Sequence, residues 1–95
     1  MPPVTVYTTR FCPYCIAAKQ LLAARDIPFT NIAVDGDHAA RADLRRRSGQ
    51  QTVPQIWIGD FHVGGYTDLR ALDLSGELQR LIASSGVNEE GRASE

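Results

Sequence analysis

Two cysteines, Cys12 and Cys15, are the only thiols in this 95-residue chain, and two residues separate them. A short β-favouring stretch precedes the pair, and an alanine- and leucine-rich stretch over residues 16–24 favours a helix after it. Pro13 suits the first helical position, where its missing N–H has no partner to lose, so Cys12 is expected at the N-cap. A helix N-terminus favours thiolate over thiol, and the thiolate is the nucleophile in thiol–disulfide exchange.

The spacing of the two cysteines predicts a redox pair. Both sulfurs would lie on one side of the first helical turn, within reach of a disulfide, and Arg10 adds a nearby cation. Cys12 is therefore the predicted nucleophile, and Cys15, one turn further into the helix and less exposed, is the predicted resolving thiol. A structural zinc site would need a second pair of ligands. The candidates for that pair are His38 and His62, which lie far apart in the sequence, so we expect no metal.

The remaining sequence predicts the element order strand, helix, strand, helix, strand, strand, helix. The expected strands cover residues 4–7, 29–34, 55–58 and 61–63, and the last two form a hairpin around Gly59 and Asp60. The expected helices cover residues 13–24, a polar segment from an Asp37 cap to about Ser48 with Gly49 as its stop, and a final segment from about residue 67. Leu74, Leu78, Leu81 and Ile82 have the spacing of its core face, with Ser75 as a candidate cap. This order is typical of an α/β sandwich.

Composition excludes several classes of protein. Ten basic residues balance eleven acidic ones, whereas nucleic-acid and membrane-surface binders normally carry a basic excess. No apolar run approaches the roughly 18 residues of a membrane span, and the first residues lack the profile of a signal peptide. Two closely spaced cysteines do not suit a secreted, disulfide-stapled domain. We therefore expect one cytoplasmic domain over residues 1–86, followed by a disordered polar tail over residues 87–95.

Three motifs follow one another along the chain: CPYC at residues 12–15, TVPQI at residues 52–56 and GGYTDL at residues 64–69. Over residues 4–82 the sequence resembles the dithiol glutaredoxins, in particular the bacterial CPYC-type members. The resemblance implies a thioredoxin-like fold, with a four-stranded mixed β-sheet flanked by helices. It also implies a cis Val53–Pro54 peptide bond, which would leave the Val53 backbone free to pair with an extended peptide such as glutathione.

The same resemblance implies a complete glutathione site. The turn before the last helix would bind the γ-glutamyl carboxylate, the Asp68 side chain would bind the ammonium group, and Arg10 would pair with the glycyl carboxylate. Tyr14 would line the groove beside the reactive sulfur, and Tyr66 departs from the small or thiol residue that relatives often carry. The implied glutathione-binding residues are Arg10, Tyr14, Thr52, Val53, Pro54, Gly65, Thr67 and Asp68.

The predicted function is glutathione-dependent thiol–disulfide oxidoreduction of protein disulfides and glutathione mixed disulfides. Glutathione would be a co-substrate, no cofactor would be tightly bound, and the chain would act as a monomer. One alternative is an electron donor to ribonucleotide reductase that a thioredoxin reductase recharges. Another is a dimer that holds an iron–sulfur cluster between two Cys12 thiolates and glutathione, although Pro13 disfavours it.

Other side chains that could suggest a ligand site receive structural interpretations. Trp57 and Phe61 are expected to pack in the core or the hairpin, and the two histidines receive no functional role. The arginines at 45–47 would complement the dipole at a solvated helix end.

Overall fold

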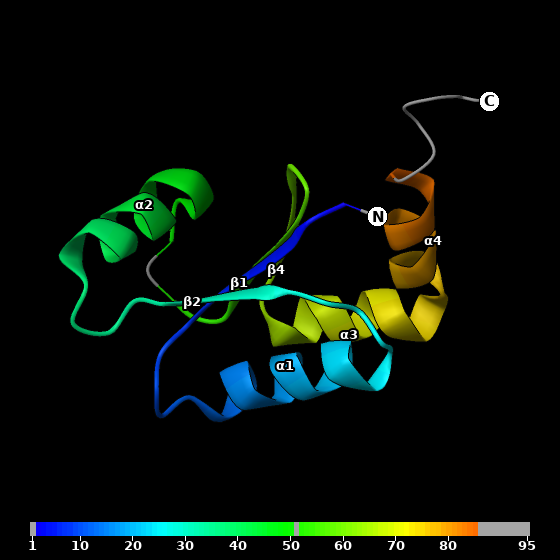
Figure 1. Cartoon of the computed structure of the whole chain (residues 1–95), viewed down its shortest axis with the longest axis horizontal. Coiled ribbons are helices and arrows are strands. Elements are labelled where there is room, and N and C mark those ends of the chain that lie inside the picture. Colours follow the sequence, from blue (N-terminus) through cyan, green and yellow to red (C-terminus); the bar gives the residue numbers. More distant parts are fainter. Residues whose placement is uncertain (1, 51, 86–95) are drawn as a thin grey trace.

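The computed structural model describes residues 2–50 and 52–85, and these residues form a four-stranded mixed sheet flanked by helices (Figure 1). The strands and helices in chain order are β1 (Val4–Thr8), α1 (Pro13–Ala24), β2 (Thr30–Ala33), α2 (His38–Ser48), β3 (Gln55–Ile58), β4 (Phe61–Gly64), α3 (Tyr66–Ser75) and α4 (Glu77–Ser85). The strand order is β2-β1-β3-β4. Strand β1 runs parallel to β2 and antiparallel to β3, which pairs antiparallel with β4. The predicted α/β architecture is confirmed.

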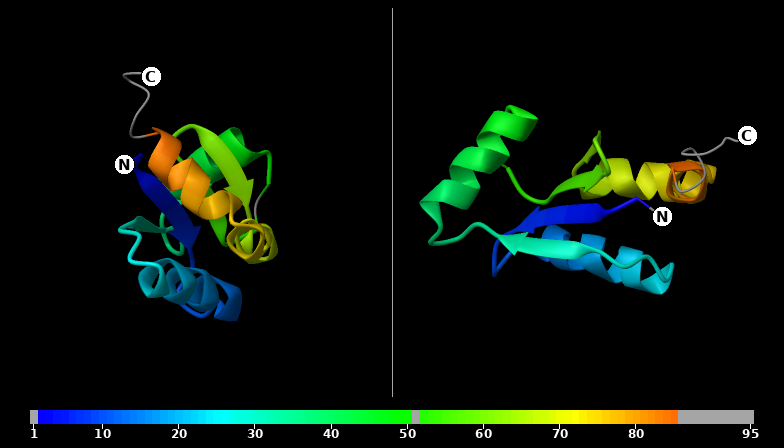
Figure 2. Two further views of the ribbon diagram at one scale, coloured as in Figure 1. Left: turned by 90° about the vertical axis from the view of Figure 1, so that its right-hand side faces the viewer. Right: turned by 45° about the horizontal axis from the view of Figure 1, so that its top comes forward.

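The sheet separates two layers of side chains, because successive residues of a strand point to opposite faces. Helices α1 and α3 lie on one side of the sheet and α2 on the other (Figures 1 and 2). The layer toward α1, α3 and α4 contains Val4, Val6, Ala18, Leu22, Ile27, Ile56, Ile58, Leu69, Leu78 and Ile82. The smaller layer toward α2 contains Tyr7, Val34, Leu44 and Trp57. The packing role predicted for Trp57 is thus confirmed.

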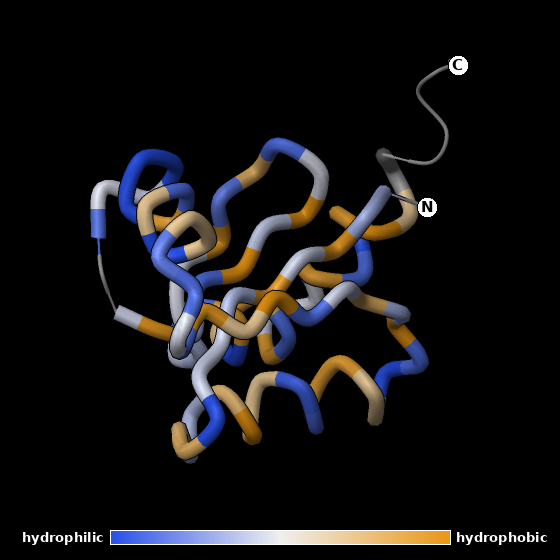
Figure 3. Tube along the Cα trace, turned by 60° about the vertical axis from the view of Figure 1, so that its left-hand side comes forward, coloured by the Kyte–Doolittle hydropathy of each residue, from blue (hydrophilic) through white to orange (hydrophobic). Residues whose placement is uncertain are grey.

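The two core layers explain the spacing of apolar residues along the chain. In α1, buried Ala18 and Leu22 recur four residues apart on the face toward the sheet. Hydrophobic and hydrophilic residues alternate along this helix, which lies at the bottom of Figure 3. Helix α2 is more polar and buries Leu44 fully.

Local capping signals position three of the helix ends as predicted. Cys12 is the N-cap of α1 and Asp37 is the N-cap of α2, where its carboxylate accepts the Ala40 N–H at 3.0 Å. Gly49 ends α2 in the left-handed region, with φ of 73°. Both ends of α2 can be predicted from the sequence, because Asp37 has a short polar side chain that caps a helix and Gly49 adopts a positive φ without strain.

The prediction of one C-terminal helix is wrong. Gly76 adopts a φ of 84° and ends α3, and α4 begins at the next residue. The two helices separate Leu74 from Leu78, so Leu74 is 73% exposed while Leu78 and Ile82 are buried. The candidate cap is found between the helices, where the Ser75 hydroxyl accepts the Glu77 N–H at 3.3 Å.

Two further sequence predictions concern the chain as a whole. The predicted polar tail over residues 87–95 lies outside the described residues, and its disorder stays a prediction. Across the segments 2–50 and 52–85, no helix combines the length and apolar character that a membrane crossing requires.

An ion pair between Arg25 and Asp73 connects the C-terminal end of α1 to α3. The Arg25 guanidinium donates two hydrogen bonds to the Asp73 carboxylate, from Nε to Oδ1 and from the terminal nitrogen to Oδ2, both at 2.8 Å. The Asp73 side chain is 8% exposed, and the hydrogen bond from Arg25 holds the pKa of this carboxyl below its ordinary value. A carboxyl with a lowered folded-state pKa stabilises the fold above its unfolded pKa, and this contribution disappears as the pH falls through the lowered value.

Replacement of Asp73 by asparagine should therefore destabilise the protein in a pH-dependent way. We expect Asp73→Asn to lower the urea midpoint at neutral pH, and the difference from the native chain to shrink below about pH 4. Asp60→Asn, in the exposed hairpin turn, is the control and should leave the midpoint unchanged. A constant difference between native and Asp73→Asn protein from neutral pH down to acid unfolding would contradict this role.

Candidate active site

Cys12 occupies the position where the chain leaves the β1–α1 loop and enters the helix. Its backbone is extended, its carbonyl accepts the Ile16 N–H at 3.1 Å, and its sulfur accepts the Cys15 N–H at 3.2 Å. The first turn of α1 contains no acidic residue. An N–H donor and the positive end of the helix dipole therefore act on a half-buried sulfur, and both favour negative charge there.

Cys15 lies in a different environment one turn further along α1. Its side chain is fully buried, and this burial is the main reason that its pKa rises to about 12; the hydrogen bond and charge of Cys12 add to the rise. A backbone hydrogen bond with Thr9 and the charge of Lys19 oppose it. Cys15 is therefore a protected neutral thiol near physiological pH, as its predicted position inside the helix requires.

The loop before β3 forms the wall opposite Cys12. The Val53–Pro54 peptide bond is cis, as the family resemblance implied, and the Val53 carbonyl oxygen lies 3.7 Å from the Cys12 sulfur. Antiparallel pairing of β1 with β3, with Tyr7 opposite Gln55, brings this loop beside the end of β1. The wall and Cys12 are thus positioned by the same pair of strands.

The first turn of α3 closes the site. Gly65 is the N-cap, and its N–H donates to the Asp68 carboxylate at 3.0 Å. Gly64 adopts a φ of 111°, and a Cβ at this position would fall on that carboxylate. The first N–H groups of a helix have no helical acceptor, so this turn presents donors suited to an anion.

A groove of about 260 Å³ lies between the α1 N-terminus, the loop before β3 and the α3 N-terminus. Its lining residues are Tyr14, Gln50, Thr52, Val53, Pro54, Gln55, Gly65, Tyr66, Thr67 and Asp68. All of the predicted glutathione-binding residues except Arg10 therefore come together in one groove. The rings of Tyr14 and Tyr66 face each other there, with centroids 6.2 Å apart.

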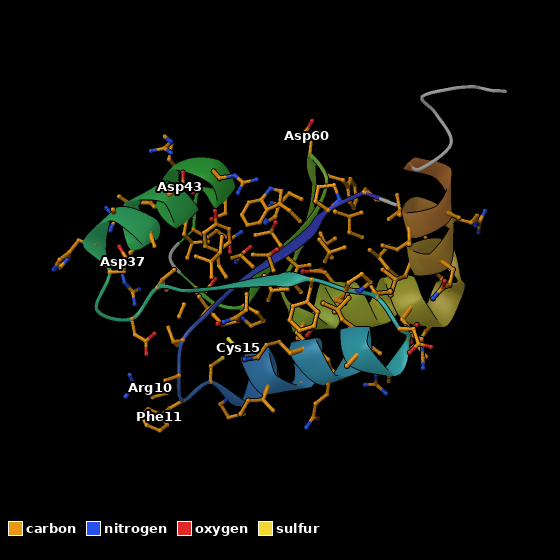
Figure 4. All side chains as sticks on the ribbon, in the orientation of Figure 1. Arg10, Phe11, Cys15, Asp37, Asp43 and Asp60 are labelled. Atoms are coloured by element: carbon orange, nitrogen blue, oxygen red, sulfur yellow. The ribbon has the colours of Figure 1, made fainter. Side chains whose placement is uncertain are left out.

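Arg10 is placed away from this groove. Its backbone N–H donates to Asp35 at 3.1 Å, and the residue lines a separate cavity that also contains Lys19. Figure 4 shows Arg10 beside Phe11 in the loop between β1 and α1. Its pairing with a glycyl carboxylate stays a prediction.

Sequence reasoning missed two glutamines in the groove, Gln50 and Gln55. Gln55 belongs to the recognised TVPQI motif, but an isolated glutamine at the start of a strand gives no sign that its side chain turns toward a groove. Gln50 precedes that motif and carries no signal. The family resemblance marks Tyr66 as a departure from its pattern, and the Tyr66 ring lies beside that of Tyr14 in the groove.

The other side chains singled out from the sequence lie away from the groove. Phe61 is 48% exposed in the β4 strand of the hairpin. The arginines at 45–47 occupy the last turn of α2 as predicted, yet the guanidinium of Arg47 packs 4.5 Å from the Trp57 ring centroid. Within residues 2–50 and 52–85, no three His, Cys, Asp or Glu side chains gather in a group that could hold a metal ion.

The fold and the site together define a class of protein. A dithiol at a strand–helix junction, opposite a cis-proline loop on a four-stranded sheet, is the arrangement of a thioredoxin-fold thiol–disulfide oxidoreductase. A family model described as glutaredoxin matches residues 4–63.

Individual relatives agree with the family match. The chain is 55% identical over 84 residues to a glutaredoxin of Pseudomonas aeruginosa. The match covers 88% of this chain and 100% of the relative. This chain is also 45% identical over 82 residues to glutaredoxin 3 of Escherichia coli K12, in a match that covers 86% of this chain and 99% of the relative. Among solved structures, the glutaredoxin of Brucella melitensis has a TM-score of 0.79 at 44% identity, over 90% of this chain and 92% of the other. This chain belongs to the glutaredoxin family.

The different environments of the two thiols predict selective alkylation. Iodoacetamide near neutral pH should modify Cys12 and leave Cys15 intact, because Cys15 is buried and its pKa is raised. Intact mass should show one adduct, and peptide mapping should place it on Cys12. Urea-unfolded protein is the control and should take up two adducts; equal labelling of both thiols in the folded protein would contradict the assignment.

Proposed function

We propose that this chain reduces protein disulfides and glutathione mixed disulfides with glutathione as co-substrate, through Cys12 as nucleophile and Cys15 as resolving thiol. The observation that carries the proposal is the groove of about 260 Å³ whose lining includes Val53, the residue whose carbonyl oxygen lies 3.7 Å from the half-buried Cys12 sulfur. Its walls offer backbone groups, a helix N-terminus and a carboxylate within one small site.

The chemistry of the groove is complementary to glutathione. The N–H groups at the start of α3 suit the γ-glutamyl carboxylate, and the exposed Asp68 carboxylate suits the adjacent ammonium group. The Val53 backbone suits the peptide portion of an extended ligand, and the Tyr14 ring lines the same groove. A buckwheat glutaredoxin solved as a complex with glutathione has a TM-score of 0.80 to this chain at 28% identity, over 90% of this chain and 80% of the other.

Reduction of a protein disulfide would use both thiols. The Cys12 thiolate attacks one sulfur of the substrate disulfide, forms a mixed disulfide and releases the other sulfur as a thiolate. Cys15 then attacks the Cys12 sulfur, its proton passes to the departing thiolate, and the Cys12–Cys15 disulfide forms. Two glutathione molecules reduce this disulfide in turn and leave as glutathione disulfide.

Removal of glutathione from a glutathionylated substrate would need Cys12 alone. The Cys12 thiolate attacks the glutathione sulfur, so that the substrate departs as a thiolate and glutathione stays on Cys12. A second glutathione thiolate then attacks this adduct, releasing glutathione disulfide and restoring Cys12. In this route the groove recognises the glutathione half of the substrate, whatever the attached protein is.

The proposal extends to the partners of this chain, its oligomeric state, its location and the role of Arg10. Its macromolecular partners would be disulfide-containing or glutathionylated proteins, with neither nucleic acid nor membrane among them. The chain would work as a monomer in the cytoplasm. Arg10 would contribute positive charge for the glycyl carboxylate of glutathione from outside the groove.

A coupled assay tests the source of electrons. Reduction of a small glutathione mixed disulfide should proceed with glutathione, glutathione reductase and NADPH, and should fail when thioredoxin reductase replaces both. Activity with thioredoxin reductase alone would overturn the proposal in favour of a glutathione-independent electron donor. A brown preparation with visible absorbance under anaerobic conditions would instead support the iron–sulfur alternative.

Serine substitutions separate the roles of the two thiols. Cys12→Ser should reduce both reactions to background, because no nucleophile remains. Cys15→Ser should retain removal of glutathione from mixed disulfides and lose reduction of protein disulfides. Equal loss of both reactions in Cys15→Ser would contradict the assigned roles.

A matched pair of glycine substitutions tests the α3 turn. In Gly64→Ala the new Cβ would displace the Asp68 carboxylate, so the KM for the glutathione mixed disulfide should rise roughly tenfold. Gly36→Ala is the control, because Gly36 also has a positive φ, of 75°, but a Cβ there meets no atom within 4 Å. If both variants changed KM equally, the effect would come from backbone strain and the proposed role of Asp68 would be wrong.

A further inference from the structure

Gln55 is a buried polar side chain beside the groove. It is the first residue of β3, it is 3% exposed, and it pairs with Tyr7 across the sheet. It lies on the α2 side, where the core layer is formed by Tyr7, Val34, Leu44 and Trp57. A buried amide without hydrogen-bond partners would lower the stability of the fold by about 1–3 kcal/mol, so both polar ends of the Gln55 side chain need partners.

Both ends of the Gln55 amide have partners. Its Oε1 lies 2.7 Å from His62 Nε2, which must then carry the proton and donate it. Its Nε2 donates to the Thr52 hydroxyl at 3.1 Å and to Gln50 Oε1 at 3.3 Å. The Thr52 hydroxyl in turn donates to Gln50 Oε1 at 3.2 Å. One buried amide therefore joins the hairpin to two residues of the groove wall.

The histidine end of this network is held firmly. The His62 ring stacks on Trp57, with centroids 4.5 Å apart and planes 19° from parallel. Trp57 is itself buried against Tyr7, and Arg47 donates to the Tyr7 hydroxyl at 2.8 Å. His62 is thus fixed by core packing and can impose one orientation on the amide.

We infer that Gln55, oriented by His62, is a positioning residue that holds Thr52 and Gln50 in the wall of the groove, an inference that rests on the proposed function for the identity of the ligand. With Oε1 turned to His62, the NH₂ group can only point toward the loop. There it fixes the Thr52 hydroxyl and occupies the oxygen of Gln50, so that the Gln50 amide presents its NH₂ group as a donor. The wall is then ordered before the ligand arrives, which lowers the entropy cost of binding.

A role in folding alone does not explain this arrangement. An apolar side chain of similar volume would fill the space beside the core layer without needing any hydrogen bond. The amide partners at its Nε2 end are both groove residues, and neither is part of a strand or helix. The position therefore serves the loop that lines the groove.

Substitutions at both ends of the network test the inference. Gln55→Leu keeps the shape and removes both hydrogen-bond ends, so the KM for the glutathione mixed disulfide should rise roughly fivefold. The kcat and the iodoacetamide reaction rate of Cys12 should stay within about twofold of native, because the nucleophile is untouched. His62→Phe keeps the stacking on Trp57, removes the donor and should raise KM by a smaller factor. His38→Phe, on the exposed surface of α2, is the control and should change nothing.

Combining the two substitutions separates a shared mechanism from general damage. Because His62 acts only through Gln55, the double variant should have the KM of Gln55→Leu alone. Multiplicative KM increases would overturn the inference, as would an unchanged KM in Gln55→Leu. A fall in kcat and in the alkylation rate without a KM change would overturn it too, because it would place the effect on the nucleophile.

A ligand-free measurement distinguishes failure of this inference from failure of the proposed function. The backbone ¹⁵N resonances of Thr52 and Val53 should shift in Gln55→Leu and in His62→Phe, and stay in place in His38→Phe. If these shifts occur while the native chain makes no use of glutathione, the positioning role stands and the proposed function falls. If the native chain uses glutathione and the resonances do not shift, the positioning role falls alone.

Discussion

The antiparallel pairing of β1 with β3 is the constraint on which the active site depends. It joins segments about fifty residues apart and places Tyr7 opposite Gln55, so the chain leaving β1 toward Cys12 passes the loop that enters β3. The position of the wall opposite Cys12 follows from this register, including the Val53 carbonyl oxygen 3.7 Å from the Cys12 sulfur. A slip by one residue would exchange the two faces of β3 and turn Gln55 and Trp57 away from α2.

The chemistry rests on giving two neighbouring thiols opposite environments. Cys12 lies at the open end of α1, where the Cys15 N–H and the helix dipole favour negative charge, while Cys15 is sealed in the core with its pKa raised to about 12. One thiol is therefore half-buried at the start of the helix, and the other is fully buried and uncharged near neutral pH. A single helical turn suffices for the contrast, because it connects the surface loop to the buried face of the helix.

The parts of this structure that sequence predicts are those with local signals. The caps at Cys12 and Asp37 and the stop at Gly49 follow from neighbouring residue types, and the predicted strands follow from their β-branched and aromatic composition. The cis Val53–Pro54 bond could be predicted only from the family resemblance, because X–Pro bonds in general are cis in only about 5–6% of cases. The missed features depend on contacts between distant segments. Neither Gln50 nor Gln55 shows in the sequence that it faces the groove, and the exposure of Leu74 follows from the change of direction at Gly76.

The central claim is that the groove beside Cys12 holds glutathione while disulfide exchange occurs there. A crystal structure of Cys15→Ser protein carrying glutathione as a mixed disulfide tests it most directly, because the missing resolving thiol traps the adduct. The account predicts a disulfide on Cys12, the glutathione peptide against the Val53 backbone and its γ-glutamyl carboxylate at the first turn of α3. An adduct whose glutathione extends away from this groove, with no contact to Val53 or Thr67, would contradict it.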